Sequence, residues 1–413
     1  MSQLHVFFRQ ELVGSINHER GKIGFAYDSS WRESESAFPI SVALPLHGEG
    51  FKQETAACFF ANLLPEANVR RRICKKLGIS EGNDFELLKA IGGDCAGALT
   101  LSANDSIPPT TFAYEPISAE QLADWSVGAP DAFSAVAGQD GIRLSLAGAQ
   151  DKLPVAIEDG KFLLPTGNSP STHILKFSSR DYSHLPENEV FVAKLATAVG
   201  LPAVEIELFE TAKSRIAVVK RYDREAGTQG PLRIHQEDFC QAIGISPINK
   251  YEKEGGPGFS DCASLIKATC TIPALEINKL LNWSVFNLLV HNADAHGKNL
   301  SLLFHNRETS LTPFYDLICT RNYENLDRKM AMTYGGKDDP DVIQQNQINQ
   351  FAEQLGVTTK LVIDTMVELR NKIETQLPKL VAEFESQFGE IPILERLPKI
   401  IRKRMNKALQ PFD

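Results

Sequence analysis

Apolar and polar residues alternate along much of the first hundred positions, and this period of two predicts β-strands. The expected strands are 5–16 (HVFFRQELVGSI, a hairpin turning near residues 9–11), 22–28, 41–46 and 97–102. Between them, apolar residues spaced three and four apart predict helices, which glycines terminate. The expected helices are 55–64, 66–77 and 84–91. We therefore expect a mixed α and β subdomain over residues 1–105.

A proline-rich stretch, 106–135, follows this subdomain and is the strongest linker signal in the chain. Beyond it, residues 140–223 predict the order β-β-β-α-β-β, and the segment 141–148 (GIRLSLAG) alternates like a strand. Residues 234–413 are predicted to be mainly helical, with a long helix over 273–290 that has a broad apolar face. The pattern predicts an α+β chain with a sheet-rich lobe before a helical one. Two unrelated domains would show the same order.

Composition narrows the class of protein. The 413 residues carry 43 Lys and Arg against 52 Asp and Glu, a formal charge of −9, which argues against a free-standing nucleic-acid binder with a uniformly basic surface. Seven cysteines without metal-ligand spacing predict reduced thiols in the cytoplasm. We expect no signal peptide and no membrane span, because no basic start precedes an apolar stretch and no run of 18 apolar residues occurs.

The strongest chemical signal is the segment 291–299 (HNADAHGKN), directly after the long apolar helix. Asp294 and Asn299 have the Asp-to-Asn spacing of a kinase catalytic loop. If the following strand pair within 300–316 is symmetric, residues whose numbers sum to 615 lie opposite each other, which places Asn299 beside Asp316. Mg²⁺ prefers such oxygen ligands together with phosphates, and Asp294 would then be free to accept a hydroxyl proton. Taken singly, each residue is better explained as a turn or cap; taken together, they favour chemistry.

Two further segments have weaker signals. Lys176 lies in an apolar strand (THILKF), either at a solvated edge or reaching inward to phosphates. Glu187 and Glu189 are candidates to orient this lysine, but capping the next helix at the surface is the better explanation for both. The segment 143–152 (RLSLAGAQDK) is rich in small residues that let backbone N–H groups approach phosphates, although its single glycine also suits an ordinary tight turn.

The remaining polar segments gave no chemistry on their own. The basic clusters 70–76 and 402–407 are expected to be solvated helix faces, with contact to nucleic acid or an acidic partner as the alternative. The segment 251–258 (YEKEGGPG) is expected to be a flexible loop.

Taken together, these segments resemble the HipA family of toxin serine/threonine kinases. The resemblance covers residues 3–385 and rests on RLSLAGAQDKLPV, THILKF, VVKRYDR, QEDFCQAIG, KYEKEGGPG, NADAHGKNLS, LTPFYDLI, FFANLLPE and GGDCAGALTL, in the family's order. It implies a two-lobed, protein-kinase-like fold with an extra N-terminal subdomain on the sheet-rich N-terminal lobe and a mainly helical C-terminal lobe. The ranges are 1–105 for that subdomain, 106–135 for a linker, 136–233 for the N-lobe and 234–413 for the C-lobe.

The resemblance also implies a role for each matching residue. Asp294 is the expected catalytic base, Asn299 and Asp316 the ligands of Mg²⁺, and Ser145 the autophosphorylated serine. The residues expected to bind ATP are the phosphate loop Ala147, Gly148, Ala149, Gln150, Asp151 and Lys152, the lysine Lys176, the hinge Lys220, Arg221 and Tyr222, and His296, Gly297, Lys298, Asn299, Tyr315 and Asp316. The family usually has an acidic residue where Lys220 stands, a change that recognition of adenine by the backbone tolerates. A phosphate on Ser145 would add negative charge just before the loop that cradles phosphates and would switch the enzyme off.

The resemblance implies partners as well. We expect a HipB-like helix-turn-helix antitoxin, with which the chain acts as corepressor on operator DNA, mainly through DNA contacts of the antitoxin. The protein substrate is expected to be an aminoacyl-tRNA synthetase, with glutamyl-tRNA synthetase the first candidate, and no membrane is involved. Two alternatives remain open: a corepressor scaffold whose kinase site is vestigial, and a small-molecule kinase.

Overall fold

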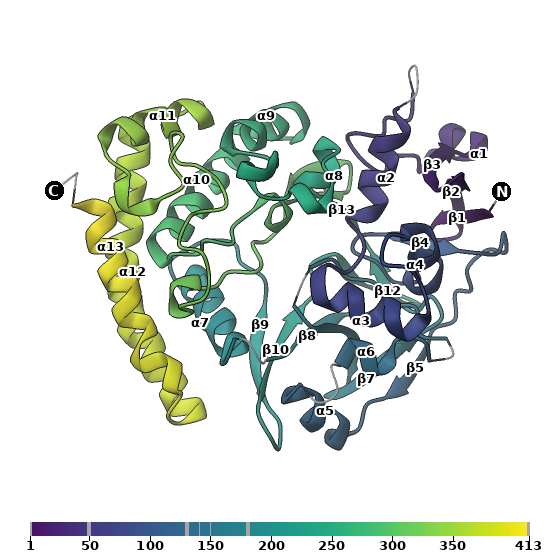
Figure 1. The fold of residues 1–413 in the computed structure, drawn as a ribbon, viewed down its shortest axis with the longest axis horizontal. Helices are drawn as coiled ribbons and strands as arrows, with labels where there is room; N and C mark the ends of the chain where they lie inside the picture. Colours follow the sequence, from purple (N-terminus) through teal and green to yellow (C-terminus); the bar gives the residue numbers. More distant parts are fainter. Residues whose placement is uncertain are drawn as a thin grey trace. The chain divides into compact units, whose positions relative to one another are not determined.

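The structure is a computed structural model that describes residues 2–47, 51–128, 132–139, 141–148, 150–178 and 182–410 (Figure 1). Packing divides the chain into two compact units. The first unit comprises Met1–Asp181, Phe209–Ile248 and Leu302–Arg307, and the second comprises Tyr182–Leu208, Asn249–Ser301 and Glu308–Asp413. The domain ranges expected from the sequence stay predictions.

The first unit begins with a four-stranded antiparallel sheet in the order β3-β2-β1-β4. Its strands are β1 Ser2–Phe8, β2 Glu11–Glu19, β3 Lys22–Tyr27 and β4 Leu99–Ser102. The predicted first hairpin is confirmed, and Arg9 adopts a left-handed φ of 55° in its turn. The helices of this part are α1 Ser29–Glu33, α2 Gln53–Ala61, α3 Ala67–Leu77 and α4 Asp84–Ile91. The three predicted helices are thus present within a few residues of their expected ends.

The strand predicted at 41–46 is wrong. This segment forms only an isolated bridge between Ser41 and Leu44. The Tyr27 hydroxyl donates a 2.6 Å hydrogen bond to the Leu44 carbonyl and accepts a 2.9 Å bond from the Ile40 N–H. A buried side chain therefore satisfies backbone groups that a strand partner would otherwise pair.

A six-stranded sheet in the order β5-β7-β6-β8-β10-β9 forms the centre of the first unit, and the unit boundary runs through β9. Its strands are β5 Ala113–Pro116, β6 Lys152–Glu158, β7 Lys161–Thr166, β8 His173–Lys176, β9 Ile206–Glu210 and β10 Arg215–Lys220. The region expected to be a linker contains β5, α5 Ala119–Ser126 and α6 Ala132–Val136. Pro116 fits there because β5 is an edge strand, where a missing N–H costs no ladder bond. Further elements of this part are β11 Arg224–Gly227, β12 Gly230–Arg233, β13 His235–Asp238, α8 Phe239–Ile243 and β14 Ser301–His305.

The strand predicted at 141–148 is also wrong. Leu144 and Gly148 form single parallel bridges, to Asp94 and Pro65 respectively. The alternation of buried residues there reflects packing into a core, and no neighbouring strand continues the ladder.

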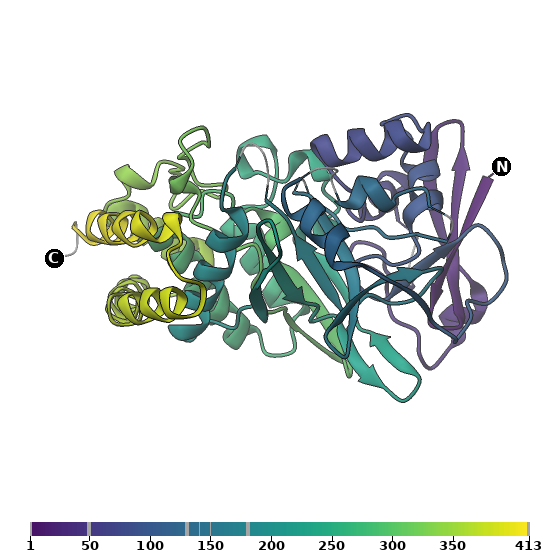
Figure 2. The same cartoon turned by 90° about the horizontal axis from the view of Figure 1, so that it is seen from below.

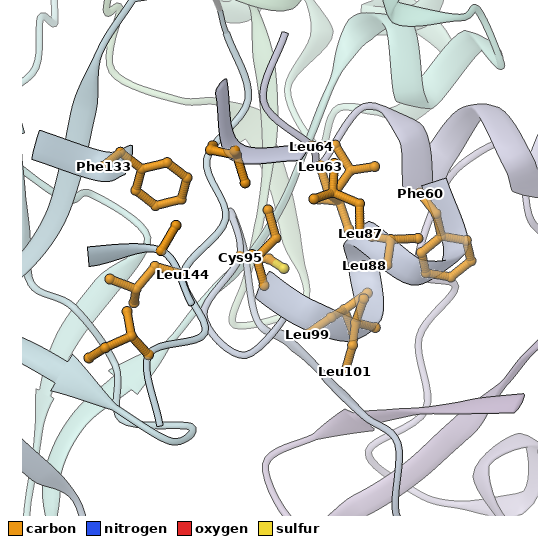
Figure 3. Packing of buried hydrophobic residues seen from close by; sticks show 14 of the residues in the cluster. Phe60, Leu63, Leu64, Leu87, Leu88, Cys95, Leu99, Leu101, Phe133 and Leu144 are labelled. Carbon is orange, nitrogen blue, oxygen red and sulfur yellow. The ribbon is translucent and has the colours of Figure 1, made fainter. Parts of the chain in front are cut away.

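The core of the first unit is a single cluster of buried side chains that extends from Leu4 to Ile216. Figure 3 shows Cys95 between Phe133 and Leu144 on one side and Leu63 and Leu87 on the other. The N-terminal subdomain expected from the sequence therefore shares its interior with the segments that follow it, including the segment that carries Ser145.

The second unit is mainly helical. Its helices are α7 Leu185–Ala198, α9 Phe259–Thr269, α10 Pro273–Val290, α11 Gln345–Leu355, α12 Thr359–Phe388 and α13 Leu397–Leu409, and it includes the strand β15 Glu308–Leu311. The short 3₁₀ helices are η1 Pro247–Asn249, η2 Glu252–Glu254, η3 Gly297–Asn299, η4 Thr320–Asn322, η5 Pro340–Val342 and η6 Pro392–Glu395. The apolar helix α10 packs against α9, α12 and α13, and Figure 2 shows α12 and α13 (yellow) side by side. In the ranges that the structure describes, no helix is long and apolar enough to cross a membrane.

Candidate functional site

The predicted catalytic loop begins where α10 ends. His291 caps the helix in the left-handed conformation with a φ of 58°, and the next N–H, of Asn292, donates a 2.9 Å bond back to the Asn287 carbonyl. Helix α10 starts with a proline in its first turn and is buried along most of its length, so it gives the loop a rigid base.

Thr320 braces the same loop. Its hydroxyl donates a 2.8 Å bond to the His291 carbonyl and accepts a 2.9 Å bond from the Ala293 N–H. Within the loop, the side-chain amide of Asn299 donates a 2.9 Å bond to the Asp294 carbonyl. Residues five apart are thus held in one tight turn, which explains why the spacing of Asp294 and Asn299 matters.

Asp294 offers its carboxylate to solvent, since 47% of its side chain is exposed. The Tyr251 hydroxyl donates a 2.6 Å hydrogen bond to Oδ1 of this carboxylate, and His296 Nε2 lies 4.0 Å from the same oxygen. Burial lowers the pKa of His296 well below its usual value, which keeps the imidazole neutral. The segment 251–258 gave no chemical signal in the sequence, so Tyr251 is a site residue that sequence reasoning missed.

Asn299 and Asp316 both lie close to His296. The Asn299 N–H donates a 2.9 Å bond to the His296 carbonyl, and the charge of Asp316 acts to raise the pKa of His296 against the effect of burial. The Asp316 backbone is left-handed, with a φ of 52°, and its carbonyl accepts a 3.2 Å bond from the Asn292 amide. The structure therefore gathers Asp294, Asn299 and Asp316 in one region of the second unit.

The register predicted for the strand pair is wrong by two residues. The chain turns at Asn306 and Arg307, both left-handed, and the Thr312 N–H donates a 3.0 Å bond to the Ser301 carbonyl. Residues whose numbers sum to 613, not 615, therefore lie opposite each other, because a two-residue turn sets the register. Asp316 comes near the loop through the bend after Leu311 and not as the direct partner of Asn299.

The donor set suits Mg²⁺ when phosphates complete the coordination. A carboxylate and an amide oxygen are the hard ligands that this ion prefers, and it commonly takes only one or two of them from the protein. No group of three or more His, Cys, Asp or Glu side chains that could hold a metal occurs in the described part of the chain.

Three more predicted site residues, Gly297, Lys298 and Tyr315, lie beside Asn299 and Asp316. The Tyr315 hydroxyl donates a 2.7 Å bond to the Lys298 carbonyl, and the Gly297 N–H donates a 3.4 Å bond to the Lys250 carbonyl.

In the first unit, Lys176 is buried on an interior strand. Strand β8 lies between β6 and β10, where Lys176 is opposite Lys152 and Ala217. Only 4% of Lys176 is exposed. The alternative of a solvated edge lysine is therefore wrong, because the strand order encloses it.

The small-residue loop shows why a glycine is needed within it. Gly148 has a φ of 114°, and a Cβ added there would lie 2.8 Å from Lys152 Nζ. Its carbonyl accepts a 3.0 Å bond from the Glu66 N–H. The Lys152 amine therefore lies directly over this part of the loop. Ala147 is also described, whereas Ala149 lies outside the described residues.

The end of the loop is fixed to its surroundings by two side chains. Gln150 Nε2 donates a 3.4 Å bond to the Phe177 carbonyl, next to Lys176, and Asp151 Oδ2 accepts a 2.9 Å bond from the Ala132 N–H. The loop and the lysine strand are thus connected within the first unit.

Ser145 has no exposed surface. Its hydroxyl donates a 2.7 Å bond to the Leu63 carbonyl, and its N–H donates a 3.0 Å bond to the Asp94 carbonyl. In this conformation Ser145 is therefore a buried serine held by the backbone around it.

The predicted hinge begins at the last residue of β10, the strand beside β8. Lys220 is exposed at the end of β10, and the Tyr222 hydroxyl is hydrogen bonded to Gln236. The Arg221 N–H donates a 2.9 Å bond to the Thr172 carbonyl, while its buried guanidinium pairs with Asp223 at 2.7 Å. The side chain of Arg221 is committed to the interior, so adenine recognition there would rest on the backbone.

Behind this hinge lies a buried charge network that sequence reasoning also missed. The Asp94 carboxylate lies 2.9 Å from both Arg224 and Arg233 and 3.3 Å from Arg221. Burial alone would raise the pKa of Asp94, but the three guanidinium groups hold it well below its usual range. The Asp94 backbone also bonds to residue 143 through its N–H and to Ser145 through its carbonyl. In the sequence, Asp94 was noted only as part of GGDCAGALTL, and its partners Arg221 and Arg224 only as part of VVKRYDR.

Glu187 and Glu189 are both buried in the first turns of α7, so the expectation that they cap this helix at the surface is wrong. His184 occupies the N-cap position instead, and its Nδ1 lies 3.3 Å from Glu187 Oε1.

Comparison with known proteins identifies the family. The HipA N-terminal domain family matches residues 4–102, and the HipA-like C-terminal domain family matches residues 144–377. The kinase-like protein Y4mE of Sinorhizobium fredii is 40% identical over 373 residues, 87% of each chain. The serine/threonine-protein kinase toxin HipA of Shewanella oneidensis is 33% identical over 387 residues, 90% of this chain and 87% of the relative.

A solved structure confirms the match. The structure of HipA, HipB and operator DNA from Shewanella oneidensis gives a TM-score of 0.85 at 29% identity and covers 98% of this chain and 97% of its own. The predicted α+β, protein-kinase-like fold, with a sheet-rich N-terminal part and a helical C-terminal part, is confirmed by this likeness. The chain belongs to the HipA family and is a serine/threonine-protein kinase of that family.

Proposed function

We propose that this kinase is the toxin of a type II toxin–antitoxin pair and transfers the γ-phosphoryl group of ATP to a serine or threonine of an aminoacyl-tRNA synthetase. Glutamyl-tRNA synthetase is the first candidate, by the resemblance to the family. The proposal is supported by the relative that is named a serine/threonine-protein kinase toxin and by the solved structure that holds HipA together with HipB and operator DNA. A HipB-like helix-turn-helix antitoxin is the partner that this likeness favours, with the chain as corepressor.

We assign a chemical role to each of the predicted site residues. Asp294 accepts the proton of the attacking hydroxyl, which its exposed carboxylate can reach. Asn299 and Asp316 hold Mg²⁺, which when bound offsets the charge of the transferring phosphates. Lys176 and the backbone of the small-residue loop bind ATP phosphates, and Lys220, Arg221 and Tyr222 bind adenine through their backbone. Most of the catalysis then comes from positioning and electrostatics.

Autophosphorylation of Ser145 requires a rearrangement of its surroundings. A hydroxyl with no exposed surface cannot reach a γ-phosphate while it is bonded to the Leu63 carbonyl. We propose that the segment around Ser145 leaves its site before modification, and that the added phosphate, too large and too charged for that site, then prevents its return. Modification would in this way remove the phosphate loop from its working position.

The observation that carries the proposal is the shared turn of Asp294 and Asn299 close to Asp316. The test is Asp294→Asn, which keeps the shape of the side chain and removes the base. Phosphate incorporation from γ-labelled ATP should fall about 10²–10⁴-fold, and growth arrest on expression should disappear. Asp364→Asn is the matched control, because Asp364 is exposed on α12 and pairs along its own helix with Lys360. An Asp294→Asn protein with the wild-type rate would refute the assigned base.

A further inference from the structure

Tyr251 makes the most direct contact with the proposed base. Its hydroxyl donates a 2.6 Å hydrogen bond to Asp294 Oδ1, across 43 positions of the chain. The edge of its ring meets His296, with ring centroids 5.2 Å apart, so the ring packs against the loop that carries Asp294. A phenol that reaches one oxygen of a half-exposed carboxylate restricts the directions in which that carboxylate can turn.

The backbone on both sides of Tyr251 is tied to the same region. Before it, the Lys250 carbonyl accepts a 3.4 Å bond from the Gly297 N–H. After it, the Glu252 N–H donates a 3.1 Å bond to the Ala331 carbonyl, and the Ala331 N–H donates a 3.0 Å bond to the Ala293 carbonyl. Two connections, one on each side, therefore hold the tyrosine in place.

The Glu252 side chain adds a third connection. Its Oε1 accepts a 2.8 Å bond from the Thr333 hydroxyl, and a Cβ added at Gly258 would lie 2.9 Å from the same oxygen. The turn that follows Tyr251 is thus packed closely around Glu252. This turn contains η2, so the expectation of a flexible loop with no role does not describe it.

We propose that Tyr251 is a positioning residue that aims the Asp294 carboxylate at the hydroxyl group to be phosphorylated. A gate that swings away for each substrate would need a segment free to move, whereas this one is bonded before and after the tyrosine. The inference rests on the proposed role of Asp294 as the base.

Other charged groups surround the pair. Lys250 and Lys253 lie over the Tyr251 ring, with their Nζ atoms 5.6 and 6.0 Å from its centroid. These groups remain in a Tyr251→Phe protein, so a change in its rate reports the loss of one hydroxyl.

The test compares Tyr251→Phe with wild type in single-turnover phosphate incorporation from γ-labelled ATP into the chain itself. The variant keeps the ring and its packing. We expect the rate at saturating ATP to fall roughly 10–100-fold, as for the loss of one hydrogen bond to a charged group, while the ATP concentration for half-maximal rate stays the same.

Two controls separate this inference from the proposed function. Tyr114→Phe removes a phenol of the first unit that donates a 3.1 Å bond to the Pro170 carbonyl, and it should leave the rate unchanged. Asp294→Asn, measured in parallel, should be inactive. An inactive Asp294→Asn together with a Tyr251→Phe protein of wild-type rate would overturn the positioning role alone. An active Asp294→Asn would overturn the role of the base.

A merely structural role for Tyr251 makes a different prediction. Thermal unfolding of Tyr251→Phe would then show a lower Tm, and the ATP concentration for half-maximal rate would rise together with the loss of rate. That combination would also count against the inference, whereas a lower rate at saturating ATP, with Tm and the ATP concentration for half-maximal rate unchanged, supports it.

Discussion

Glu237 is a carboxyl group held in the interior of the first unit. Its Oε1 accepts a 2.9 Å bond from the Val42 N–H. Burial raises its pKa to about 8 and the neighbouring charge of Asp238 adds to this, whereas the hydrogen bonds from Ser41 and Val42 act in the opposite direction. In the folded chain this group therefore keeps its proton near neutral pH, while in the unfolded chain it has lost it.

This difference makes stability depend on pH. The contribution of Glu237 is fully present below its ordinary pKa of 4.5 and is lost as pH rises towards 8, because the unfolded state binds fewer protons there. We expect the free energy of unfolding to fall by up to about 1.4 kcal/mol per pH unit in this range. Glu237→Gln keeps the oxygen that accepts the Val42 N–H bond and cannot ionise. The denaturant midpoint of this variant should therefore change less with pH than that of the wild type.

The window between pH 6.5 and 8 isolates this effect from the buried histidines. Burial lowers the pKa of His235 and of His291 to about 4, so their contributions change below pH 6.5 and in the opposite direction. Equal slopes for wild type and Glu237→Gln between pH 6.5 and 8 would show that Glu237 is ionised in the folded chain.

Helix α13 is connected through one buried arginine to α10, the helix that precedes the loop with Asp294. Arg404 Nε donates a 3.3 Å bond to the Leu288 carbonyl in the last turn of α10, and Nη2 donates a 2.6 Å bond to the Pro340 carbonyl. Its Nη1 pairs at 2.6 Å with Asp341, which also pairs with Lys407. The HipA-like C-terminal domain match ends at residue 377, before this helix, yet the helix supports the base of the loop that carries Asp294.

Arg404→Ala should therefore destabilise the second unit. Two buried carbonyls lose their donors and a charge-assisted bond is lost, which together cost about 2–4 kcal/mol. Arg402→Ala, two residues away on the exposed side of the same helix, is the control and should change stability by less than about 0.5 kcal/mol. Urea unfolding of both variants makes the comparison, and equal midpoints would remove Arg404 from this role.

The elements that could be predicted are those whose causes are local. Helix α10 matches its predicted ends because a proline starts it and a broad apolar face runs to its last turn. The sequence could not show that segment 141–148 is not a strand, because its single bridges go to Asp94 and Pro65, which are distant in the chain. Whether Lys176 is at an edge or inside depends on the order of strands, which long-range pairing decides.

The candidate site divides in the same way. Asp294 and Asn299 could be found because five residues in one loop carry the chemistry. Tyr251 could not, because its partner lies 43 residues further on and nothing in its own segment indicates a contact with a carboxylate. Asp94 was hidden for the same reason, since its three arginines lie more than a hundred residues further along the chain.

At the scale of the whole molecule, charge predicts weak binding to DNA. The net charge is −9. In the structure, some cations of the two basic clusters, 70–76 and 402–407, are already engaged within the protein. Lys76 donates to the carbonyls of Ser134 and Ala135, and Arg404 is buried. These cations are therefore less available to phosphates than their sequence suggests.

Without an antitoxin, the chain should bind a duplex carrying its own upstream region with a Kd no tighter than about 10⁻⁶ M at physiological salt. Fluorescence anisotropy of the labelled duplex measures this, and adding the helix-turn-helix protein expected as partner should tighten binding. A nanomolar, sequence-specific complex of the chain alone would contradict the assignment of DNA contacts to the partner.

The Asp94 network also determines when the first unit can fold during synthesis of the chain. Arg224 follows Asp94 by 130 positions, so at about 5–20 residues per second a ribosome needs roughly 6–26 s to supply it. Until then, burying Asp94 would leave a carboxylate without its counterions, which is strongly unfavourable. The first unit can therefore close only after translation has passed the middle of the chain, and a chain terminated before that point would not have a working kinase.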